Sequence, residues 1–198
     1  MNPDIEYTAE FATALDALHK GHSIFLTGKA GTGKSTLIRD FIATSDAQVF
    51  VTATTGIAAL NIGGETVHRL LGMKPGTTEY DVNSGSYHPK SRSRVIRSIQ
   101  TLIIDEASML RADTFDMIVA ILEMYGPQPE KPFGGVQLVL VGDLYQLPPV
   151  VRDEEKDYFR TVYDSPFFFS GHRYIRELVP PFVLTKVFRQ SGDPELTQ

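Results

Sequence analysis

The fold of this chain is decided by residues 23–42, which read SIFLTGKAGTGKSTLIRDFI. Residues 28–35 (GKAGTGKS) match the pattern G-x-x-x-x-G-K-[ST] in full, between a short apolar run and a segment with helical spacing. Glycines let such a backbone curl until its N–H groups point at a phosphate chain, and the helix that follows adds its positive end. We therefore predict a nucleotide-binding loop made of Gly28, Lys29, Ala30, Gly31, Thr32, Gly33, Lys34, Ser35 and Thr36.

Two side chains of this loop have specific predicted roles. The amine of Lys34 can reach the β- and γ-phosphates of ATP, and the hydroxyl of Ser35 can bind Mg²⁺. The alternative is a glycine-rich turn that binds nothing. The order of apolar run, loop and helix argues against that alternative, because it is the setting in which the motif works.

Apolar runs and helical segments alternate along the rest of the chain. The runs are rich in β-branched residues, unbroken and bounded by turn residues, which is typical of strands buried on both faces of a parallel sheet. This alternation predicts the α/β class, a P-loop NTPase with a doubly wound, mostly parallel sheet and helices on both faces. The predicted strands are 23–27, 48–53, 101–105, 136–141 and 182–185, and the predicted helices are 8–19, 34–43, 55–61, 65–71 and 112–125, the last with Asp113 as a possible N-cap. Residues 72–90 and 126–135 are predicted to be surface loops.

Composition narrows the class of protein further. The chain has 198 residues, 42% of them hydrophobic, which suits one globular domain. It has no cysteine, no run long enough to cross a membrane and no secretory signal, so we expect a protein of the bacterial cytoplasm, or of the nucleus or mitochondrion of a eukaryote. The net charge of -5 argues against a broad DNA-binding surface but not against a narrow groove. One local basic run, residues 90–97, is a solvated helix face or a contact for phosphates.

Two carboxylates follow the predicted strand 101–105. Asp105 ends the strand and is placed to hold Mg²⁺, while Glu106 is placed to polarise the attacking water as a general base. The alternative is a helix cap after a strand, where acidic residues are common. A base beside the metal ligand favours hydrolysis over transfer to an acceptor, since we find no clear acceptor-binding lid.

Polar residues also follow the next two predicted strands. In GDLYQLPPV (142–150), Gln146 can contact the γ-phosphate or the attacking water, and the two prolines stiffen the exit of the turn. An ordinary turn containing Asp143 explains the same residues. In KVFRQ (186–190), Arg189 can pair with a phosphate through two parallel hydrogen bonds, or it is a surface arginine.

The motifs resemble one family when they are taken in order. GKAGTGKS, TATTGIAALNIGGETVHRLLG, IIDEASML, GDLYQLPPV and VFRQ are similar to the motifs of superfamily-one DNA helicases of the PIF-one group, which belong with the RecD-like enzymes. The resemblance covers residues 8–192, and the second and fourth motifs are its most specific part. It implies the N-terminal RecA-like motor domain of an enzyme that uses ATP to move 5′ to 3′ on single-stranded DNA and to unwind duplex or structured DNA.

The resemblance also implies roles for single residues. Lys34, Ser35, Asp105 and Glu106 keep the roles given above, Gln146 becomes the γ-phosphate sensor, and Arg189 becomes a catalytic phosphate-binding arginine. Single-stranded DNA contacts are implied for Thr54, Thr55, Gly56, Thr66 and His68. A helix residue that packs against its own domain is the alternative for His68. Residues 151–170, with six aromatic residues, lie where the family carries a strand-separating wedge, although plain core aromatics are the alternative.

The chain departs from the family pattern at both ends. The family has an adenine-recognising Gln before the first strand, but residues 1–22 contain no Gln and Phe11 stands near that position. The family also continues into a second RecA-like domain, which we expect to be absent from these 198 residues. We therefore expect ATP and Mg²⁺ as cofactors, a monomer, and single-stranded DNA or 5′-tailed duplex as partners, but little unwinding by this chain alone.

Two other classes of function stay open on the sequence. One is a P-loop ATPase that does not act on nucleic acid, for which DNA would not stimulate hydrolysis. The other is a nucleotide-binding or strand-binding module without turnover, against which Glu106 argues.

Overall fold

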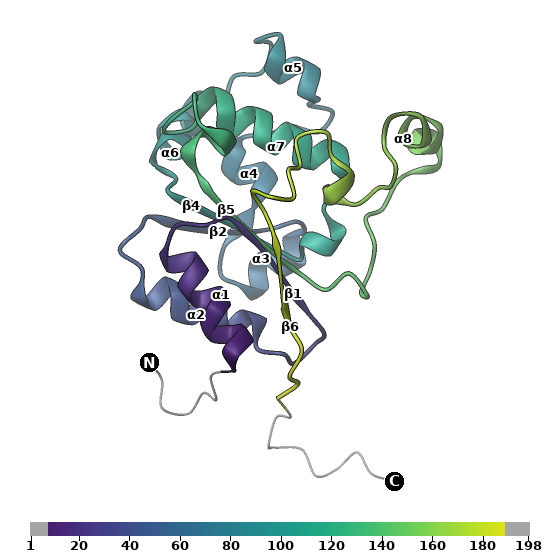
Figure 1. Ribbon diagram of the computed structural model, residues 1–198. Coiled ribbons are helices and arrows are strands. Elements are labelled where there is room, and N and C mark those ends of the chain that lie inside the picture. Colours follow the sequence, from purple (N-terminus) through teal and green to yellow (C-terminus); the bar gives the residue numbers. More distant parts are fainter. Residues whose placement is uncertain (1–7, 189–198) are drawn as a thin grey trace.

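The computed structural model describes residues 8–188 and shows one layer of parallel strands between two layers of helices (Figure 1). The sheet has the order β3-β2-β4-β5-β1-β6, and every pair of neighbours is parallel. Its strands are β1 (Ile24–Gly28), β2 (Val49–Ala53), β3 (Glu65–Thr66), β4 (Thr101–Asp105), β5 (Gln137–Gly142) and β6 (Pro181–Leu184). The predicted doubly wound α/β fold is confirmed.

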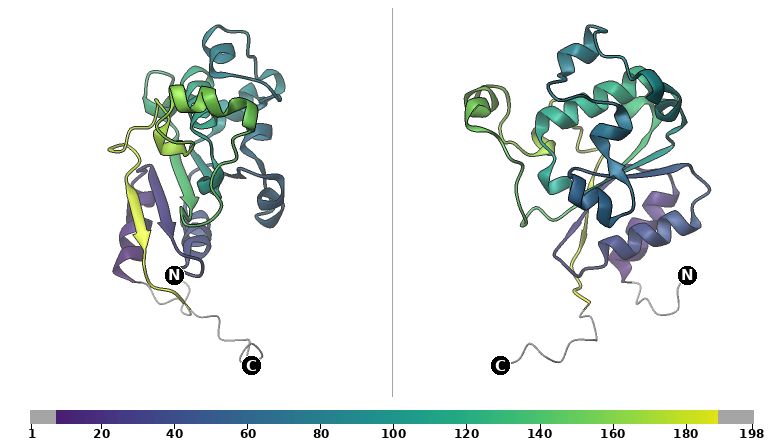
Figure 2. Two further views of the ribbon diagram at one scale, coloured as in Figure 1. Left: turned by 90° about the vertical axis from the view of Figure 1, so that its right-hand side faces the viewer. Right: turned by 180° about the vertical axis from the view of Figure 1, so that it is seen from behind.

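The helices connect successive strands and cover the two faces of the sheet (Figure 2). They are α1 (Ala9–His19), α2 (Lys34–Thr44), α3 (Gly56–Asn61), α4 (Val67–Leu71), α5 (Glu79–Asn83), α6 (Ser93–Ser98), α7 (Ala112–Tyr125) and α8 (Lys156–Val162). Short 3-10 turns are η1 (Lys90–Arg92), η2 (Ala107–Met109), η3 (Pro132–Gly135), η4 (Asp153–Glu155) and η5 (Phe168–Ser170). None of the helices in residues 8–188 has both the length and the apolarity that crossing a membrane demands.

The core is divided by the sheet because successive side chains of a strand point to opposite faces. On β4, Leu102 and Ile104 are buried with α4, α6 and α7, whereas Ile103 is buried with α1 and α2. On β5, Leu138 and Leu140 join the first group, and Val139 and Val141 join the second. All of these side chains are at most 3% exposed, so both faces of the sheet are covered at β4 and β5, whereas Val183 on the edge strand β6 is 51% exposed. This explains why the strands read as unbroken apolar runs in the sequence.

Three sequence expectations need correction. The predicted helix 65–71 begins with the strand β3, and only its later part is α4. Within the predicted loop 72–90, a capping box of Thr78 and Asp81 starts the short helix α5. Asp113 does not cap α7: Arg111 holds the N-cap position, and the Asp113 carboxylate instead accepts hydrogen bonds from Arg111 and from the Thr114 N–H.

Candidate active site

The carboxyl ends of the strands bring the predicted site residues to one edge of the sheet. Because all strands are parallel, the segments that leave β1, β4 and β5 emerge side by side. These segments are the phosphate loop, the Asp105–Glu106 pair and the turn that begins at Asp143. Thr55, which follows β2, and Thr66, the last residue of β3, lie at the same edge. They are one and two strands beyond β4. We call this the strand-end edge.

The phosphate loop has the backbone that its glycines predict. A Cβ atom on Gly28 would lie 2.4 Å from the carbonyl oxygen of Leu184, so only glycine fits between β1 and β6. Gly33 takes the left-handed conformation, with φ 92°, and it begins α2 without a side-chain cap. The first helical bond of α2 runs from Leu37 N to Gly33 O, which leaves the N–H groups of residues 34–36 without a helical acceptor. With no acidic residue in this turn, the start of α2 suits an anionic ligand.

Lys34 lies inside the curve of this loop. Its Nζ donates to the carbonyl oxygens of Gly28, at 2.6 Å, and Lys29, at 3.1 Å. Partial burial lowers the pKa of Lys34, and the carboxylates of Asp143, Glu106 and Asp105 oppose that shift. The amine is therefore surrounded by the groups that the sequence assigned to metal binding, to the base and to the sensor turn.

The segment that follows β6 closes over the phosphate loop. The Phe188 N–H donates to the carbonyl oxygen of Gly31 at 2.9 Å, and the ring of Phe188 lies 3.6 Å from where a Cβ on Gly33 would be. Glu10 of α1 holds the start of this segment, because its carboxylate accepts hydrogen bonds from the backbone and the hydroxyl of Thr185, at 2.9 and 2.7 Å. Arg189, the predicted phosphate-binding arginine, lies outside the described residues.

Asp105 and Glu106 stand at the end of β4. Glu106 has φ 53° and ψ 40°, a left-handed conformation that few non-glycine residues adopt, and its N–H donates to Asp105 Oδ1 at 2.9 Å. Strain of this kind gathers at functional sites. Burial raises the pKa of Glu106, and the neighbouring charge of Asp105 raises it further. A carboxyl with a raised pKa is suited to accept a proton from water.

The donor set at this edge fits Mg²⁺ only together with a nucleotide. In residues 8–188 no three acidic or histidine side chains gather closely enough to hold a metal by themselves. Ser35 lies exposed at the first turn of α2, and Asp105 is half-buried at the end of β4. One hydroxyl and one carboxylate match a magnesium ion that takes its other oxygens from phosphates and water.

Asp143 is the site residue whose role the sequence left unassigned. It is 6% exposed, and its carboxylate accepts hydrogen bonds from Tyr145 N, at 3.1 Å, and from Gln146 Nε2, at 3.2 Å. Asp143 therefore joins the electrostatic surroundings of Lys34 to the position of Gln146. The sequence feature that could have revealed this role is the position of Asp143 three residues before Gln146. An aspartate in a turn is too common, however, to predict these hydrogen bonds.

The predicted DNA contacts divide into two groups. Thr55 and Thr66 are N-caps of α3 and α4, and their oxygens accept from Ala58 N and Arg69 N at 3.3 and 3.2 Å. Each hydroxyl proton can still be donated to a phosphate, and Gly56 is exposed beside Thr55. Thr54 differs, because its hydroxyl donates to the Glu106 carbonyl oxygen at 3.1 Å. Thr54 thus links this group to the end of β4.

His68 is half-buried on α4. Burial lowers the pKa of His68, and the carboxylate of Asp113 on α7 opposes the shift. The ring is therefore neutral near pH 7, which suits stacking on a base or sugar better than pairing with a phosphate. Its partial burial also agrees with the alternative interpretation, in which it packs within its own domain.

The aromatic residues of the segment 151–170 are shared between core and surface. Phe168 is fully buried in the main core, while Phe159 and Tyr163 form a small separate cluster with Ala112. Tyr158 and Phe169 are 55% and 40% exposed. Helix α8 stands away from the body of the molecule in Figure 1 and in the right-hand view of Figure 2. Plain core packing thus explains three of the six aromatics. Phe167 is partly exposed and stacks on Phe169, and core packing does not explain the two exposed rings.

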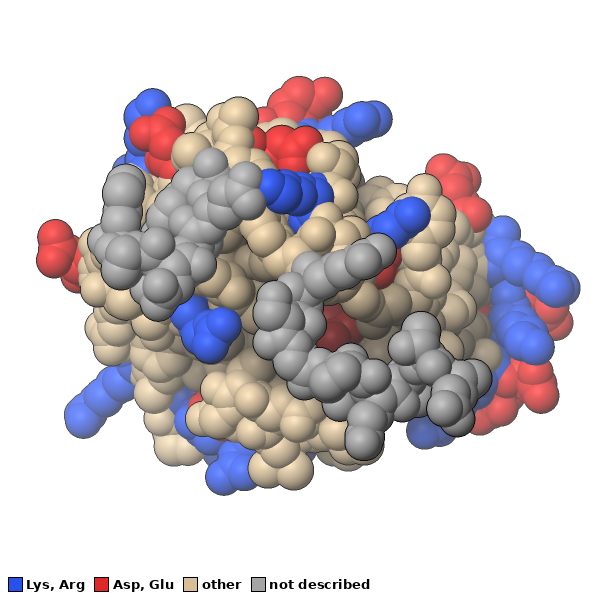
Figure 3. Space-filling model, turned by 90° about the horizontal axis from the view of Figure 1, so that it is seen from below, with Lys and Arg blue, Asp and Glu red and all other residues tan. Residues whose placement is uncertain are grey.

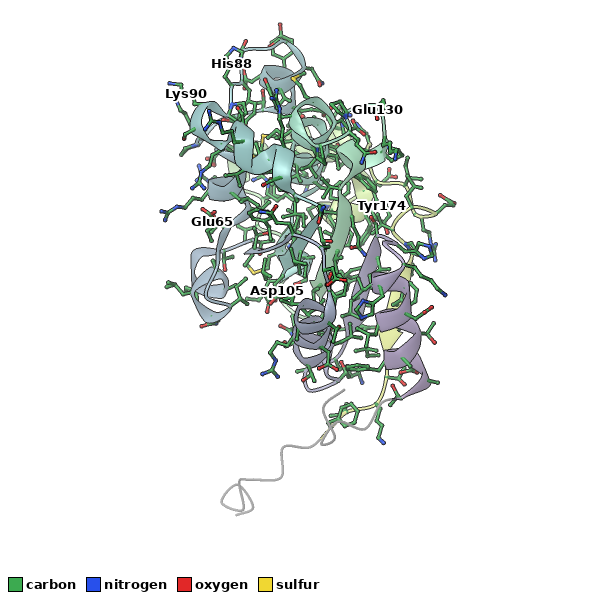
Figure 4. The ribbon with its side chains drawn as sticks, turned by 90° about the vertical axis from the view of Figure 1, so that its left-hand side faces the viewer. Glu65, His88, Lys90, Asp105, Glu130 and Tyr174 are labelled. Carbon is green, nitrogen blue, oxygen red and sulfur yellow. The ribbon has the colours of Figure 1, made fainter. Side chains whose placement is uncertain are left out.

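The structure also shows where two other features of the sequence lie, Phe11 and the basic run 90–97. Phe11, at the position of the missing Gln, is 1% exposed and packs in the core with α2. Figure 4 shows Lys90 and His88 near the top of the molecule, well above Asp105, whereas Arg92 of the basic run pairs with Glu65 of β3 at 3.1 Å. Seen from below in Figure 3, basic and acidic side chains are interspersed around the rim of the molecule.

Comparison with known proteins gives one consistent family. The family model described as PIF1-like helicase matches residues 6–197. Among curated proteins, the ATP-dependent DNA helicase PIF1 of Saccharomyces cerevisiae (strain YJM789) is 38% identical over 180 residues, which cover 87% of this chain and 20% of that protein.

Solved structures agree with the sequence comparison. Bacteroides Pif1 bound to ssDNA has a TM-score of 0.82 at 37% identity, over 96% of this chain and 44% of that one. Bacteroides sp Pif1 in complex with ADP-AlF4 has a TM-score of 0.83 at 38% identity, over 95% of this chain and 44% of that one. The chain therefore spans less than half the length of each relative named here.

Proposed function

The chain belongs to the PIF1-like helicase family, and on that premise we propose that it is the ATP-hydrolysing motor domain of a DNA helicase that moves 5′ to 3′ on single-stranded DNA. One observation carries the proposal: the phosphate loop, the two carboxylates and the sensor turn meet at the same edge as the helix starts after β2 and β3. A site for ATP and a site for a DNA backbone thus share one row of strand ends.

The hydrolytic roles follow from the positions of the groups. The open N–H groups of α2 and the amine of Lys34 would bind the β- and γ-phosphates, and Ser35 and Asp105 would hold Mg²⁺. When bound, the metal ion supplies positive charge that neutralises the phosphate oxygens. Glu106 would take a proton from the attacking water, and Gln146 would sense the γ-phosphate from the turn that Asp143 fixes. Arg189 would add a second cationic group.

The DNA-binding roles rest on a different chemistry. Thr55, Gly56 and Thr66 present hydroxyl and N–H donors at the starts of two helices, which bind phosphates without reading sequence. The neutral ring of His68 is suited to stack beside them. Helix α8 is proposed as part of the strand-separating wedge, which its position away from the body supports.

The hydroxyl that links the two sites suggests how they communicate. Thr54 follows β2, next to the proposed phosphate contact at Thr55, and donates to the carbonyl oxygen of Glu106. A displacement of Glu106 during hydrolysis would therefore reach the DNA-binding segment through one hydrogen bond.

Direction and unwinding are tested on tailed duplexes with the natural protein that carries this chain. We expect strand displacement with a 5′ single-stranded tail, Mg²⁺ and ATP, and none with a 3′ tail or with Lys34→Ala. Equal displacement from both tails would refute the direction. ATP hydrolysis that single-stranded DNA does not stimulate would instead favour a P-loop ATPase that does not act on nucleic acid.

A further inference from the structure

The turn after β5 presents an aromatic ring almost entirely to solvent. Tyr145 is 92% exposed, more than any other large apolar or aromatic side chain in residues 8–188. Leu147 and Val150 in the same segment are 70% and 68% exposed. In the sequence, Tyr145 stands between Asp143 and Gln146, two residues already placed in the site. The proposed hydrolysis of ATP nevertheless gives Tyr145 no role.

The backbone holds this ring in place. The N–H of Tyr145 donates to Asp143 Oδ1 at 3.1 Å, and the N–H of Gln146 donates to the carbonyl oxygen of Asp143 at 2.9 Å. Asp143 is itself buried, and Pro148 and Pro149 restrict the chain beyond the turn. A ring on a rigid support loses little conformational entropy when it binds a ligand. The exposure of Tyr145 is thus a property of an ordered turn.

The position of the turn indicates which ligand the ring would meet. Adjacent parallel strands lie about 4.8 Å apart, so the end of β5 is about 10 Å from the end of β2 and about 14 Å from that of β3. Tyr145 therefore extends the row that holds Thr55 and Thr66. The turn that carries Tyr145, GDLYQLPPV (142–150), has no Lys or Arg that could pair with a DNA phosphate. The uncharged face of a nucleobase fits there, and every base can stack on an aromatic ring.

We propose that Tyr145 stacks on a base of single-stranded DNA and forms the base-binding end of a row whose other members hold the phosphates. This inference rests on the proposed function and adds a residue to it. Because Gln146 is the next residue on the same turn, a base that occupies Tyr145 would fix the turn from which Gln146 reaches the nucleotide.

Abasic DNA separates stacking from every other contact. The binding of a fluorescent oligothymidine to the natural protein that carries this chain would be measured by anisotropy at low salt, together with an oligonucleotide of the same length without bases. We expect Tyr145→Ala to weaken binding of oligothymidine by about 5- to 150-fold, the range that base stacking gives on aromatic residues. Tyr145→Phe keeps the ring and should bind as the parent does. On the abasic strand, the parent and Tyr145→Ala should bind equally.

A matched control comes from Tyr80 on α5, which is 77% exposed and lies apart from the strand-end edge (Figure 1). Tyr80→Ala should leave DNA binding unchanged, and all three variants should keep the parental melting temperature because neither ring is buried. Oligothymidine binding that is unchanged in Tyr145→Ala would overturn the stacking proposal while leaving the proposed function intact. If the natural protein that carries this chain binds neither strand, the proposed function itself fails. An equal loss on the abasic strand would show that Tyr145 acts on the backbone, which also overturns the proposal.

Discussion

The Nζ atom of Lys34 lies 2.6 Å from the carbonyl oxygen of Gly28, so the amine donates to the loop that it is expected to share with a phosphate chain. Both residues belong to the same eight-residue motif, and the contact closes the loop on itself across β1 and α2. A phosphate oxygen bears more negative charge than a carbonyl oxygen, so the amine should exchange one partner for the other when ATP binds.

Nucleotide affinity should depend on this amine. Lys34→Ala removes a charge-assisted hydrogen bond, and we expect a loss of about 1.5–3 kcal/mol in the binding of ATP with Mg²⁺. Titration with a fluorescent ATP analogue measures it. Lys20→Ala is the control, since Lys20 is exposed and pairs with Asp16 on α1. Parental affinity in Lys34→Ala would remove the assignment of the loop as the phosphate site.

Turnover should depend on Glu106 in a way that pH reveals. Glu106→Gln keeps the shape of the side chain but not the base, so ATP should still bind and hydrolysis should be lost. Because the pKa of Glu106 is raised by burial and by Asp105, the base becomes protonated at a higher pH than the usual 4.5. The rate should therefore begin to fall, on acidification, at a higher pH than for an unperturbed glutamate. A pH–rate profile with single-stranded DNA present measures this, with the exposed Glu130→Gln as control. Near-parental hydrolysis by Glu106→Gln would make Glu106 a structural residue.

Stability should depend on Asp116, a fully buried carboxylate of α7. It accepts hydrogen bonds from Tyr163 Oη at 3.2 Å, His172 N at 3.0 Å and Arg173 N at 2.8 Å. Asp116→Asn replaces one acceptor by a donor and leaves a buried N–H or O–H unpaired. We expect this to lower the free energy of unfolding by about 1–3 kcal/mol. Urea unfolding tests this, and the exposed Asp46→Asn should change stability by less than about 0.5 kcal/mol. Equal stabilities of the two variants would mean that Asp116 does not hold the segment 163–173.

The attachment of α8 should depend on the fork of Arg111, the pair of hydrogen bonds from its guanidinium to the carboxylate of Glu155. Its guanidinium binds Glu155 at 2.7 and 3.1 Å, also binds Asp113, and lies 4.7 Å from the centre of the Phe159 ring. Arg111→Lys cannot form the fork, so amides of α8 should exchange hydrogen faster while those of α7 stay protected. Arg160→Lys is the control, since Arg160 is exposed on α8 itself.

Acidification should have the same effect on α8 as the loss of the fork. The hydrogen bond from Arg111 lowers the pKa of Glu155 below its usual 4.5. The contribution of Glu155 to stability is therefore complete above the unfolded value and is lost as the pH falls through the lower, folded value. Exchange in α8 that is the same in Arg111→Lys as in the parent would show that the small cluster around Phe159 suffices to hold the helix.

The parts of the fold that the sequence predicts well are those with local causes. The central strands β4 and β5 are predictable because each is covered on both faces and so reads as an unbroken apolar run. The phosphate loop was found because its glycines and Lys34 are adjacent in the chain. Asp105 and Glu106 are predictable at the end of β4 because the apolar run LII, residues 102–104, stops there.

The parts that were missed depend on distant contacts. The two residues of β3 form a strand only because they pair with Thr52 and Ala53 of β2. Asp116 is buried by residues 163–173, although an aspartate in a helix normally faces solvent. The role of Asp143 needs the ends of β1, β4 and β5 to meet, which no local pattern encodes.

If one edge of the sheet binds both ATP and single-stranded DNA, as we propose, the two ligands should affect each other's binding. The affinity of the chain for a labelled oligothymidine at low salt would be measured without nucleotide and with saturating Mg²⁺ and a non-hydrolysable ATP analogue. We expect the nucleotide to change DNA affinity by a factor of about 5 or more, a typical coupling, and Lys34→Ala to remove the change but not the DNA binding. Affinity for DNA that is the same with and without bound nucleotide, or a nucleotide effect that persists in Lys34→Ala, would contradict it.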